Sequence, residues 1–198
     1  MAHTEHSFAS PGPAGLGALA VACFGFGAVF LGKVGLGGLP LLAAWLVGGG
    51  IVQYTTAVIE LKDHGIVGGN VFLFFAAFFM FAASLSLFAK FMLITFNMKP
   101  LSTVEGWCWM AGAGFLTAVL PGYFKANKAI CIAVILIDVA LWMIVFLDLG
   151  MADPAVYKPI VGYLLIIAGW IGIYLAGAIA CNTAYGKAIY PVPSPFIK

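Results

Sequence analysis

The sequence HGIVGGNVFLFFAAFFMFAASLSLFA, residues 64–89, contains no Asp, Glu, Lys or Arg. A helix needs about 20 predominantly apolar residues to cross the roughly 30 Å hydrocarbon core of a bilayer, and this stretch exceeds that length. Within lipid, only helices and closed barrels satisfy their backbone polar groups, and a continuous apolar run lacks the alternation of a barrel strand. Residues 64–89 therefore predict a membrane-spanning helix.

Similar stretches lie on both sides of this one. Four are free of charged side chains and one is interrupted by Asp138 alone; they cover residues 6–32, 34–59, 106–124, 159–186 and 129–147. The expected fold class is all-α, a polytopic membrane protein whose six transmembrane helices form a bundle. The expected helices cover about 14–32, 40–61, 66–95, 104–123, 127–147 and 158–181. Because the connections are short, residues 1–198 are expected to form a single transmembrane domain.

The composition also favours a membrane protein. Hydrophobic residues make up 64% of the 198 residues and charged residues only 8%, whereas a soluble domain is about 25% charged. Nine lysines, no arginine and seven acidic residues leave a formal net charge of +2. So few polar side chains cannot cover a water-exposed surface, which argues against a soluble enzyme or a nucleic-acid binder.

The positions of the lysines indicate an orientation in the membrane. With six spans, five lysines lie on the side of the two termini and four on the other side, which favours cytoplasmic termini. Residues 1–10 contain no Lys or Arg, and the first apolar run is longer than the core of a signal peptide, so a retained first helix is expected. We expect a multi-pass protein of the plasma membrane, which is the inner membrane in a Gram-negative cell.

Cysteine and histidine give no sign of metal or redox chemistry. No C-x-x-C spacing occurs, and buried free thiols are expected for the four cysteines, Cys23, Cys108, Cys131 and Cys181. The histidines fall in the N-terminal segment and in one loop, so no metal site and no cofactor are predicted. A membrane-embedded enzyme is not expected either, because Ser84, Ser86 and Asp138 lack a histidine partner within the bilayer.

A few polar residues interrupt the apolar helices. Gln53, Thr56 and Glu60 fall on one helical face by +3 and +4 steps near the end of the second helix. This face either lines a substrate pathway or, for Glu60 beside Lys62, marks the membrane interface. Asn70, near the start of the third helix, either satisfies backbone groups or lines a pore.

Aromatic and small residues form two further patterns. Phe72, Phe75 and Phe79 follow the same helical spacing on the third helix, where they either pack the bundle or form a hydrophobic constriction that gates by dewetting. Glycines recur at helical spacing in several helices, as at Gly162 and Gly169, and let helix backbones approach closely in lipid. They predict a tight bundle and a stable oligomer.

The segment before the first helix resembles a known signature. Ser10-Pro11-Gly12-Pro13-Ala14-Gly15-Leu16 is similar to the Asn-Pro-Ala-Pro-Leu-Gly-Leu motif of the acetate uptake transporters, also called the acetate/succinate permeases, with Ser10 in place of Asn and Ala14 in place of Leu. The similarity continues through residues 49–53, Glu60-Leu61-Lys62, Gly68 and Phe72, and it resumes at residues 173–176, 185–187 and 190–191. The resemblance thus covers nearly the whole chain.

This resemblance implies a function and an assembly. It implies a six-helix protomer with its own central pore, assembled as a homohexamer. Members of the family move acetate and related short carboxylates, some of them succinate, by channel-like or proton-coupled transport. The resemblance places the pore constriction at Leu19, Phe75 and Ile137, where the family commonly has Phe, Tyr and Leu. Phe75 therefore lacks a phenolic hydroxyl that could bond a carboxylate.

Two features near the implied pore yield hypotheses of their own. Successive helical residues are about 100° apart, so if Ile137 points into the pore, Asp138 points toward a neighbouring helix or the pore edge. An ionised carboxylate is costly in hydrocarbon, so Asp138 is a candidate for coupling a proton to anion passage, with a hydrogen-bonded structural role as the alternative. The free N–H groups from Gly15 onward are a candidate anion vestibule, unless the two prolines only set the start of the helix.

Other functions are compatible with the same sequence. The bundle could conduct another small solute, such as formate, bicarbonate, urea or ammonia. It could also be a structural membrane subunit that transports nothing, since the small-residue packing serves that purpose equally well.

Overall fold

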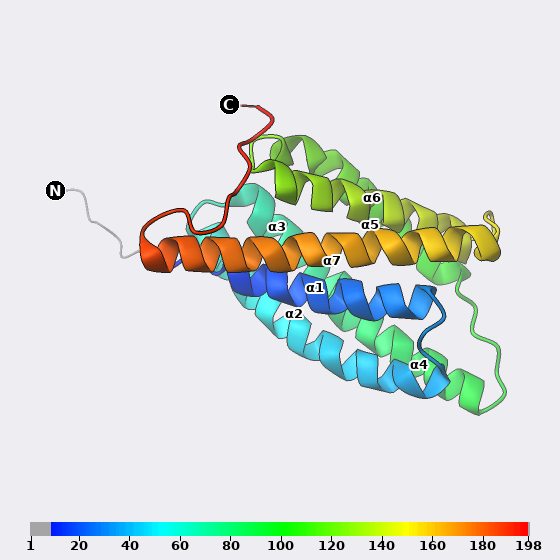
Figure 1. Ribbon diagram of the computed structural model, residues 1–198. Helices are drawn as coiled ribbons and strands as arrows, with labels where there is room; N and C mark the ends of the chain where they lie inside the picture. Colours follow the sequence, from blue (N-terminus) through cyan, green and yellow to red (C-terminus); the bar gives the residue numbers. More distant parts are fainter. Residues whose placement is uncertain (1–8, 198) are drawn as a thin grey trace.

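The computed structural model describes residues 9–197, which form a bundle of long helices running side by side (Figure 1). The described residues contain no β-strand, so the predicted all-α fold class is confirmed. The elements are α1 (Gly12–Phe30), the 3-10 turn η1 (Leu36–Gly38), α2 (Leu39–Lys62), α3 (Ile66–Phe75), η2 (Ala76–Ala82), α4 (Ala83–Thr95), α5 (Thr103–Tyr123), α6 (Lys128–Asp148) and α7 (Pro154–Tyr185).

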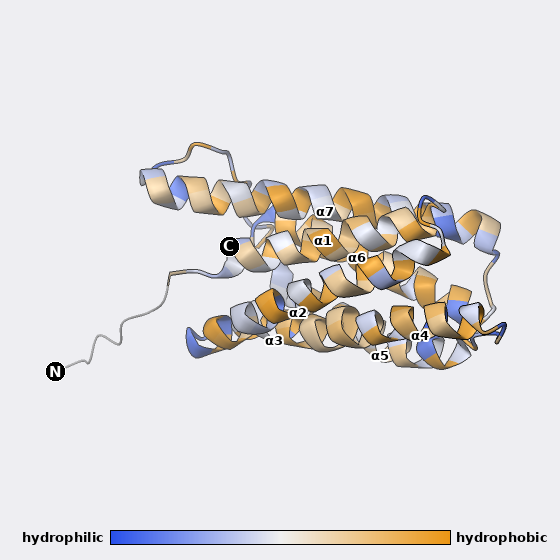
Figure 2. Ribbon diagram, turned by 90° about the horizontal axis from the view of Figure 1, so that it is seen from below, coloured by the Kyte–Doolittle hydropathy of each residue, from blue (hydrophilic) through white to orange (hydrophobic). Residues whose placement is uncertain are grey.

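The helices have the dimensions and apolarity of a membrane bundle. The segments 12–30, 36–62, 66–95, 128–148 and 154–185 are each long and apolar enough to cross a bilayer. At 21 residues α5 has the length of a span but is less apolar, and we count it as the sixth because it packs along α6. Hydrophilic residues gather toward the ends of the helices and apolar residues over their middle (Figure 2).

The third span is not one regular helix. Between α3 and α4, residues Ala76–Ala82 form the π-helical segment η2. The segment begins directly after Phe75 and contains Phe79 and Met80, all three of which are buried. Hydrogen bonds from residue i to i+5 widen the turn, and such segments occur often at functional sites. The expected continuous helix over 66–95 is wrong in this detail, because the local sequence contains no proline or other signal for the change.

Small residues lie where α1 and α7 approach most closely. A Cβ atom on Gly27 of α1 would lie 3.1 Å from the carbonyl oxygen of Gly162 of α7, and a Cβ on Gly162 would lie 3.1 Å from the carbonyl oxygen of Gly27. Farther along, a Cβ on Gly172 would lie 3.3 Å from the carbonyl oxygen of Leu16. These glycines let the two backbones touch, as expected for helices that pack in lipid.

The C-terminal tail folds back onto the bundle. Helix α7 ends at Gly186, whose φ of 62° is the left-handed conformation that glycine adopts without strain. The side-chain oxygen of Asn182 accepts hydrogen bonds from the backbone N–H groups of Ile189 and Tyr190. The N–H of Phe196 then donates to the carbonyl of Phe124, 3.1 Å away, in the connection between α5 and α6.

The four cysteines are all free, but they differ in exposure. Cys23 and Cys131 are buried, as expected. Cys108 is exposed on α5 and Cys181 is half-buried on α7, so the expectation of buried thiols is wrong for these two. The sequence placed them within or beside apolar helices but did not tell which face of each helix points outward.

Candidate functional site

The three residues implied as a constriction come from three helices and all lie in the core. Leu19 of α1 is 8% exposed, Phe75 of α3 is 4% exposed and Ile137 of α6 is 3% exposed. They belong to one contiguous apolar cluster at the centre of the bundle. Such a cluster is an apolar barrier to any polar solute passing along the bundle axis.

A second layer of aromatic rings lies next to Phe75. The ring of Phe79 lies 5.4 Å from that of Phe75 between centroids, and it also contacts Phe26 of α1 at 5.1 Å and Trp109 of α5 at 5.8 Å. The helical spacing of Phe75 and Phe79 indicated that the two rings share a face. Phe26 and Trp109 carried no signal in the sequence, because their meeting depends on which helices are neighbours.

Gln53 is an exception to the rule that buried polar groups are hydrogen-bonded. Its side chain is wholly buried, at 0% exposure, and neither its Nε2 nor its Oε1 atom has a hydrogen-bond partner in the described chain. Leaving a buried polar group unpaired costs about 1–3 kcal/mol. An amide kept at that cost on the inward face of α2 can bond a water molecule or a solute inside the bundle.

Thr56 ties the same face of α2 to the signature segment. Its hydroxyl is buried and donates a long hydrogen bond of 3.5 Å to the carbonyl of Pro11. A Cβ atom on Gly15 would lie 2.8 Å from Cγ2 of Thr56 and 2.9 Å from the ring of Phe72. Helix α1 therefore approaches α2 and α3 closely at Gly15. The signature segment, residues 10–16, lies where these three helices pack together.

The expected anion vestibule at the start of α1 is wrong. The N–H groups of Ala14 and Gly15 both donate to the carbonyl of Pro11, at 3.0 and 3.2 Å. The N–H of Gly12 lies 3.4 Å from the hydroxyl of Ser10, and a proline follows it. The alternative holds instead, because Pro11 and its neighbours set the start of the helix and leave these donors occupied.

The carboxylate of Glu60 lies at the end of the bundle where α1 begins. One carboxylate oxygen would lie 3.6 Å from a Cβ on Gly12, and the carboxylate also contacts Gly68, in the first turn of α3. The N-termini of α1 and α3 both favour a negative charge at this position. Asn70 does not join the group, since it is exposed and its amide donates to the carbonyl of Ile66 at 2.7 Å.

Asp138 lies beside the central cluster, at the contact between α6 and α5. It is 8% exposed, and both carboxylate oxygens lie 2.9 Å from the hydroxyl of Thr117 on α5. The indole N–H of Trp142 donates to that hydroxyl at 3.0 Å. The carboxylate therefore ends a chain of hydrogen bonds along the α5–α6 contact. Thr117 was not predicted, because only the packing of α5 on α6 brings it to Asp138. Trp142 lies one turn after Asp138 on α6, so the +4 spacing in the sequence could have indicated it.

A cavity of about 290 Å³ occupies the opposite end of the bundle. Six helices line it, and its walls include Phe26, Phe79 and Trp109 of the second aromatic layer. The charged residues in its lining are Lys90 of α4, Glu105 of α5, Asp148 of α6 and Lys158 of α7. No sequence pattern relates these four residues, since each one lies at the end of a different apolar run.

Comparison of the sequence with known protein families and with curated proteins finds no match. Comparison with solved structures finds the bacterial acetate channel SatP, with a TM-score of 0.79 over 93% of this chain and 99% of the SatP chain. The chain has the fold of SatP. Because the two sequences are only 20% identical, the structural likeness establishes the fold alone. The helical bundle thus has a fold that a known channel also has.

Proposed function

We propose that this protein lets acetate and related short carboxylates cross a membrane through the middle of its helical bundle. The observation that carries the proposal is the match of nearly the whole chain to an acetate channel. The resemblance of residues 10–16 to the acetate transporter signature supports the same substrate class. A transport role, rather than catalysis, follows from this proposal.

The arrangement of the core supports a path along the bundle axis. The cavity at one end leads to Phe79, and the ring of Phe79 contacts that of Phe75 in the central cluster. Beyond the cluster, the inward face of α2 presents Gln53 and then Glu60. A carboxylate that leaves water must find replacement hydrogen bonds. The unpaired amide of Gln53 offers a donor inside the bundle. Thr56 lies on the same face, where its hydroxyl donates to the carbonyl of Pro11.

The chemistry of the path favours small solutes. Leu19, Phe75 and Ile137 form the constriction in this proposal, with Phe72 lining the path near Thr56. An apolar constriction admits a solute only when the solute sheds most of its water, which is easiest for a small one with a single charge. Asp138, beside the path, takes up and releases a proton during transport in this proposal and so couples a proton gradient to anion passage.

The proposal includes an assembly and a location. The protein assembles as a homohexamer in the plasma membrane, each protomer with its own path, and its termini are cytoplasmic. The resemblance to the acetate uptake transporters supports the hexamer, and the large apolar side chains exposed on the outside of the bundle support a location in lipid.

Reconstitution into liposomes tests the proposal. We expect labelled acetate to enter protein-containing liposomes faster than empty ones, which control for passage of acetic acid through the lipid. Gln53→Leu should lower the flux, whereas Asn70→Leu, a change of similar size at an exposed position, should not. If formate, bicarbonate, urea or ammonia passes and acetate does not, the substrate class is wrong. If no small solute enters, the protein is a structural subunit.

A further inference from the structure

The cavity opposite the termini is lined by an unusual set of charges. Lys90 and Glu105 form an ion pair, and the hydroxyl of Ser86 donates to the same carboxylate. Asp148 lies within electrostatic range of Lys90, Glu105 and Lys158. Two ammonium groups and two carboxylates from four different helices therefore surround one hollow.

These four charged groups lie at positions where they contribute little to the stability of the fold. Asp148 is the last residue of α6, where the helix dipole disfavours a negative charge. The side chains of Lys90 and Glu105 are only 29% and 20% exposed, so both have lost much of their water. Partly buried ion pairs add little stability, because desolvation offsets much of the attraction.

The hollow has room for a ligand of the same chemistry as Glu105. A water molecule occupies about 30 Å³ in the liquid, so a cavity of about 290 Å³ accommodates a small carboxylate with several waters. A carboxylate from solution presents to Lys90 the same kind of charged oxygen that Glu105 presents, and such charge-assisted hydrogen bonds are the strong ones in proteins. Glu105 and an entering anion therefore compete for one ammonium group.

We propose that Lys90 is the residue that captures a carboxylate entering the path at this end, and that Glu105 is a built-in competitor that the anion displaces. This inference rests on the proposed function and names how the substrate is recognised. When no anion is bound, Glu105 pairs with Lys90 and the formal charges of the four groups cancel. The captured anion takes the place of the Glu105 carboxylate on Lys90 and is held weakly enough to move on toward Phe79.

Weak capture is what conduction requires. A lone lysine in a partly buried hollow would bind an anion tightly and release it slowly, whereas conduction needs a site that is favourable to enter and easy to leave. Glu105 supplies the weakening, because the anion must replace a carboxylate that is already in place. Removal of Glu105 therefore strengthens binding, while removal of Lys90 weakens it.

Acetate uptake into liposomes over a range of acetate concentrations tests this inference. Glu105→Gln keeps the size of the side chain and an acceptor for Ser86. We expect it to lower the acetate concentration at half-maximal flux by about fivefold, the size of a partly exposed ion pair. Lys90→Gln should raise that concentration by at least about fivefold. A gain in apparent affinity in the Glu105 variant cannot arise from poor folding.

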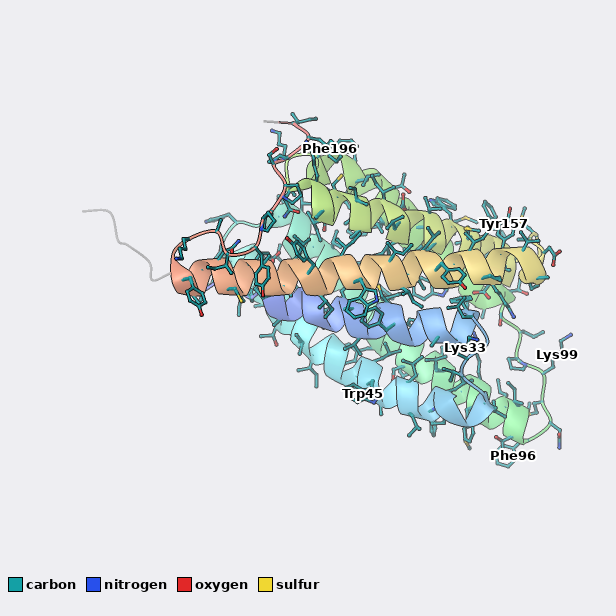
Figure 3. The ribbon with its side chains drawn as sticks, viewed as in Figure 1. Lys33, Trp45, Phe96, Lys99, Tyr157 and Phe196 are labelled. Atoms are coloured by element: carbon teal, nitrogen blue, oxygen red, sulfur yellow. The ribbon has the colours of Figure 1, made fainter. Side chains whose placement is uncertain are left out.

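Two controls separate this effect from a general change in charge or shape. Lys99→Gln removes the same charge from an exposed loop residue at the end of the bundle where Lys33 also lies (Figure 3), and should leave the half-maximal concentration unchanged. Uptake of acetamide, which is neutral and of similar size, should respond equally little to Lys90→Gln and Lys99→Gln. A parallel loss of acetamide uptake in the Lys90 variant would indicate collapse of the path and overturn the inference.

The outcomes distinguish this inference from the function on which it rests. If the wild-type protein carries no carboxylate, the proposed function fails and the inference fails with it. If the wild type carries acetate but Glu105→Gln leaves the half-maximal concentration unchanged or raises it, only the competition between Glu105 and substrate is wrong. If Lys90→Gln behaves like Lys99→Gln, Lys90 does not capture the anion.

Discussion

The strength of the hydrogen bond between Asp138 and Thr117 provides a test of whether the Asp138 carboxyl takes up and releases a proton. Both carboxylate oxygens lie 2.9 Å from the Thr117 hydroxyl, which itself accepts from Trp142. A hydrogen bond to an ionised group contributes about 1.5–3 kcal/mol to stability, and one between neutral groups about 0.5–1.5 kcal/mol. The charge on Asp138 is therefore worth roughly 1 kcal/mol in this contact.

A double-mutant cycle isolates that contribution. Asp138→Asn removes the charge and keeps an acceptor oxygen, while Thr117→Val removes the donor and keeps the shape. The coupling energy between the two changes, measured by reversible unfolding in detergent micelles, should be about 1 kcal/mol when the carboxyl is ionised and near zero when it is protonated. We therefore expect the coupling energy to be largest at high pH and to fall as the pH is lowered.

Transport gives the second measurement. If Asp138 couples a proton to anion passage, Asp138→Asn should abolish the dependence of acetate uptake on a pH gradient while downhill flux survives. Thr55→Val is a matched control for Thr117→Val, because the Thr55 hydroxyl is exposed and bonds only the carbonyl of Ile51 in its own helix. A folded Asp138→Asn protein with unchanged pH dependence, and a coupling energy that does not vary with pH, would refute proton exchange and leave Asp138 as a structural group.

Three further predictions concern the constriction, the signature and the assembly. Phe75→Ala should raise the flux of acetate and of larger carboxylates at a stability cost of about 3–5 kcal/mol, and equal flux in a folded variant would contradict a constriction there. Gly15→Ala should destabilise the protein by about 1–3 kcal/mol through contact with Thr56 and Phe72. Gly17→Ala, which has open space for its Cβ, should not. In mild detergents the particle mass should be six times 20.8 kDa, and a monomer in every detergent would contradict the hexamer.

The helices were predictable because hydrocarbon imposes a strict length and polarity on each span. The ends of the helices were less predictable than their apolar middles, as α7 illustrates. The apolar pattern predicted residues 158–181, whereas the helix runs from Pro154 to Tyr185. The extension at the start depends on Asp153, whose carboxylate accepts from the N–H of Ala155 at 2.9 Å and caps the helix. At the other end, Gly186 closes it. Such local capping acts outside the membrane, where hydropathy carries no information.

The inward face of α2 was predictable from the sequence, whereas the contacts between helices in the rest of the site were not. Gln53, Thr56 and Glu60 share a face by the period of a single helix, and this period is written in the local sequence. The pair Lys90 and Glu105 comes from two helices, and the contact between Phe79 and Trp109 does as well. No local period relates such residues. Their proximity depends on how the helices pack, which only the three-dimensional structure provides.

The charges of the path lie at its two ends, and this arrangement determines where selection acts. At one end the Glu60 carboxylate contacts the first turns of α1 and α3, and at the other Lys90 pairs with Glu105. Between them, the described core offers a carboxylate the Gln53 amide within mostly apolar walls. In the proposed path, an anion gains attraction from Lys90 at one end, whereas the Glu60 carboxylate at the other end repels it, and it must lose its water to pass through the narrow part. In this proposed path, selection by charge belongs to the ends and selection by size belongs to the rings of Phe75 and Phe79, so we expect separate substitutions to alter the two properties.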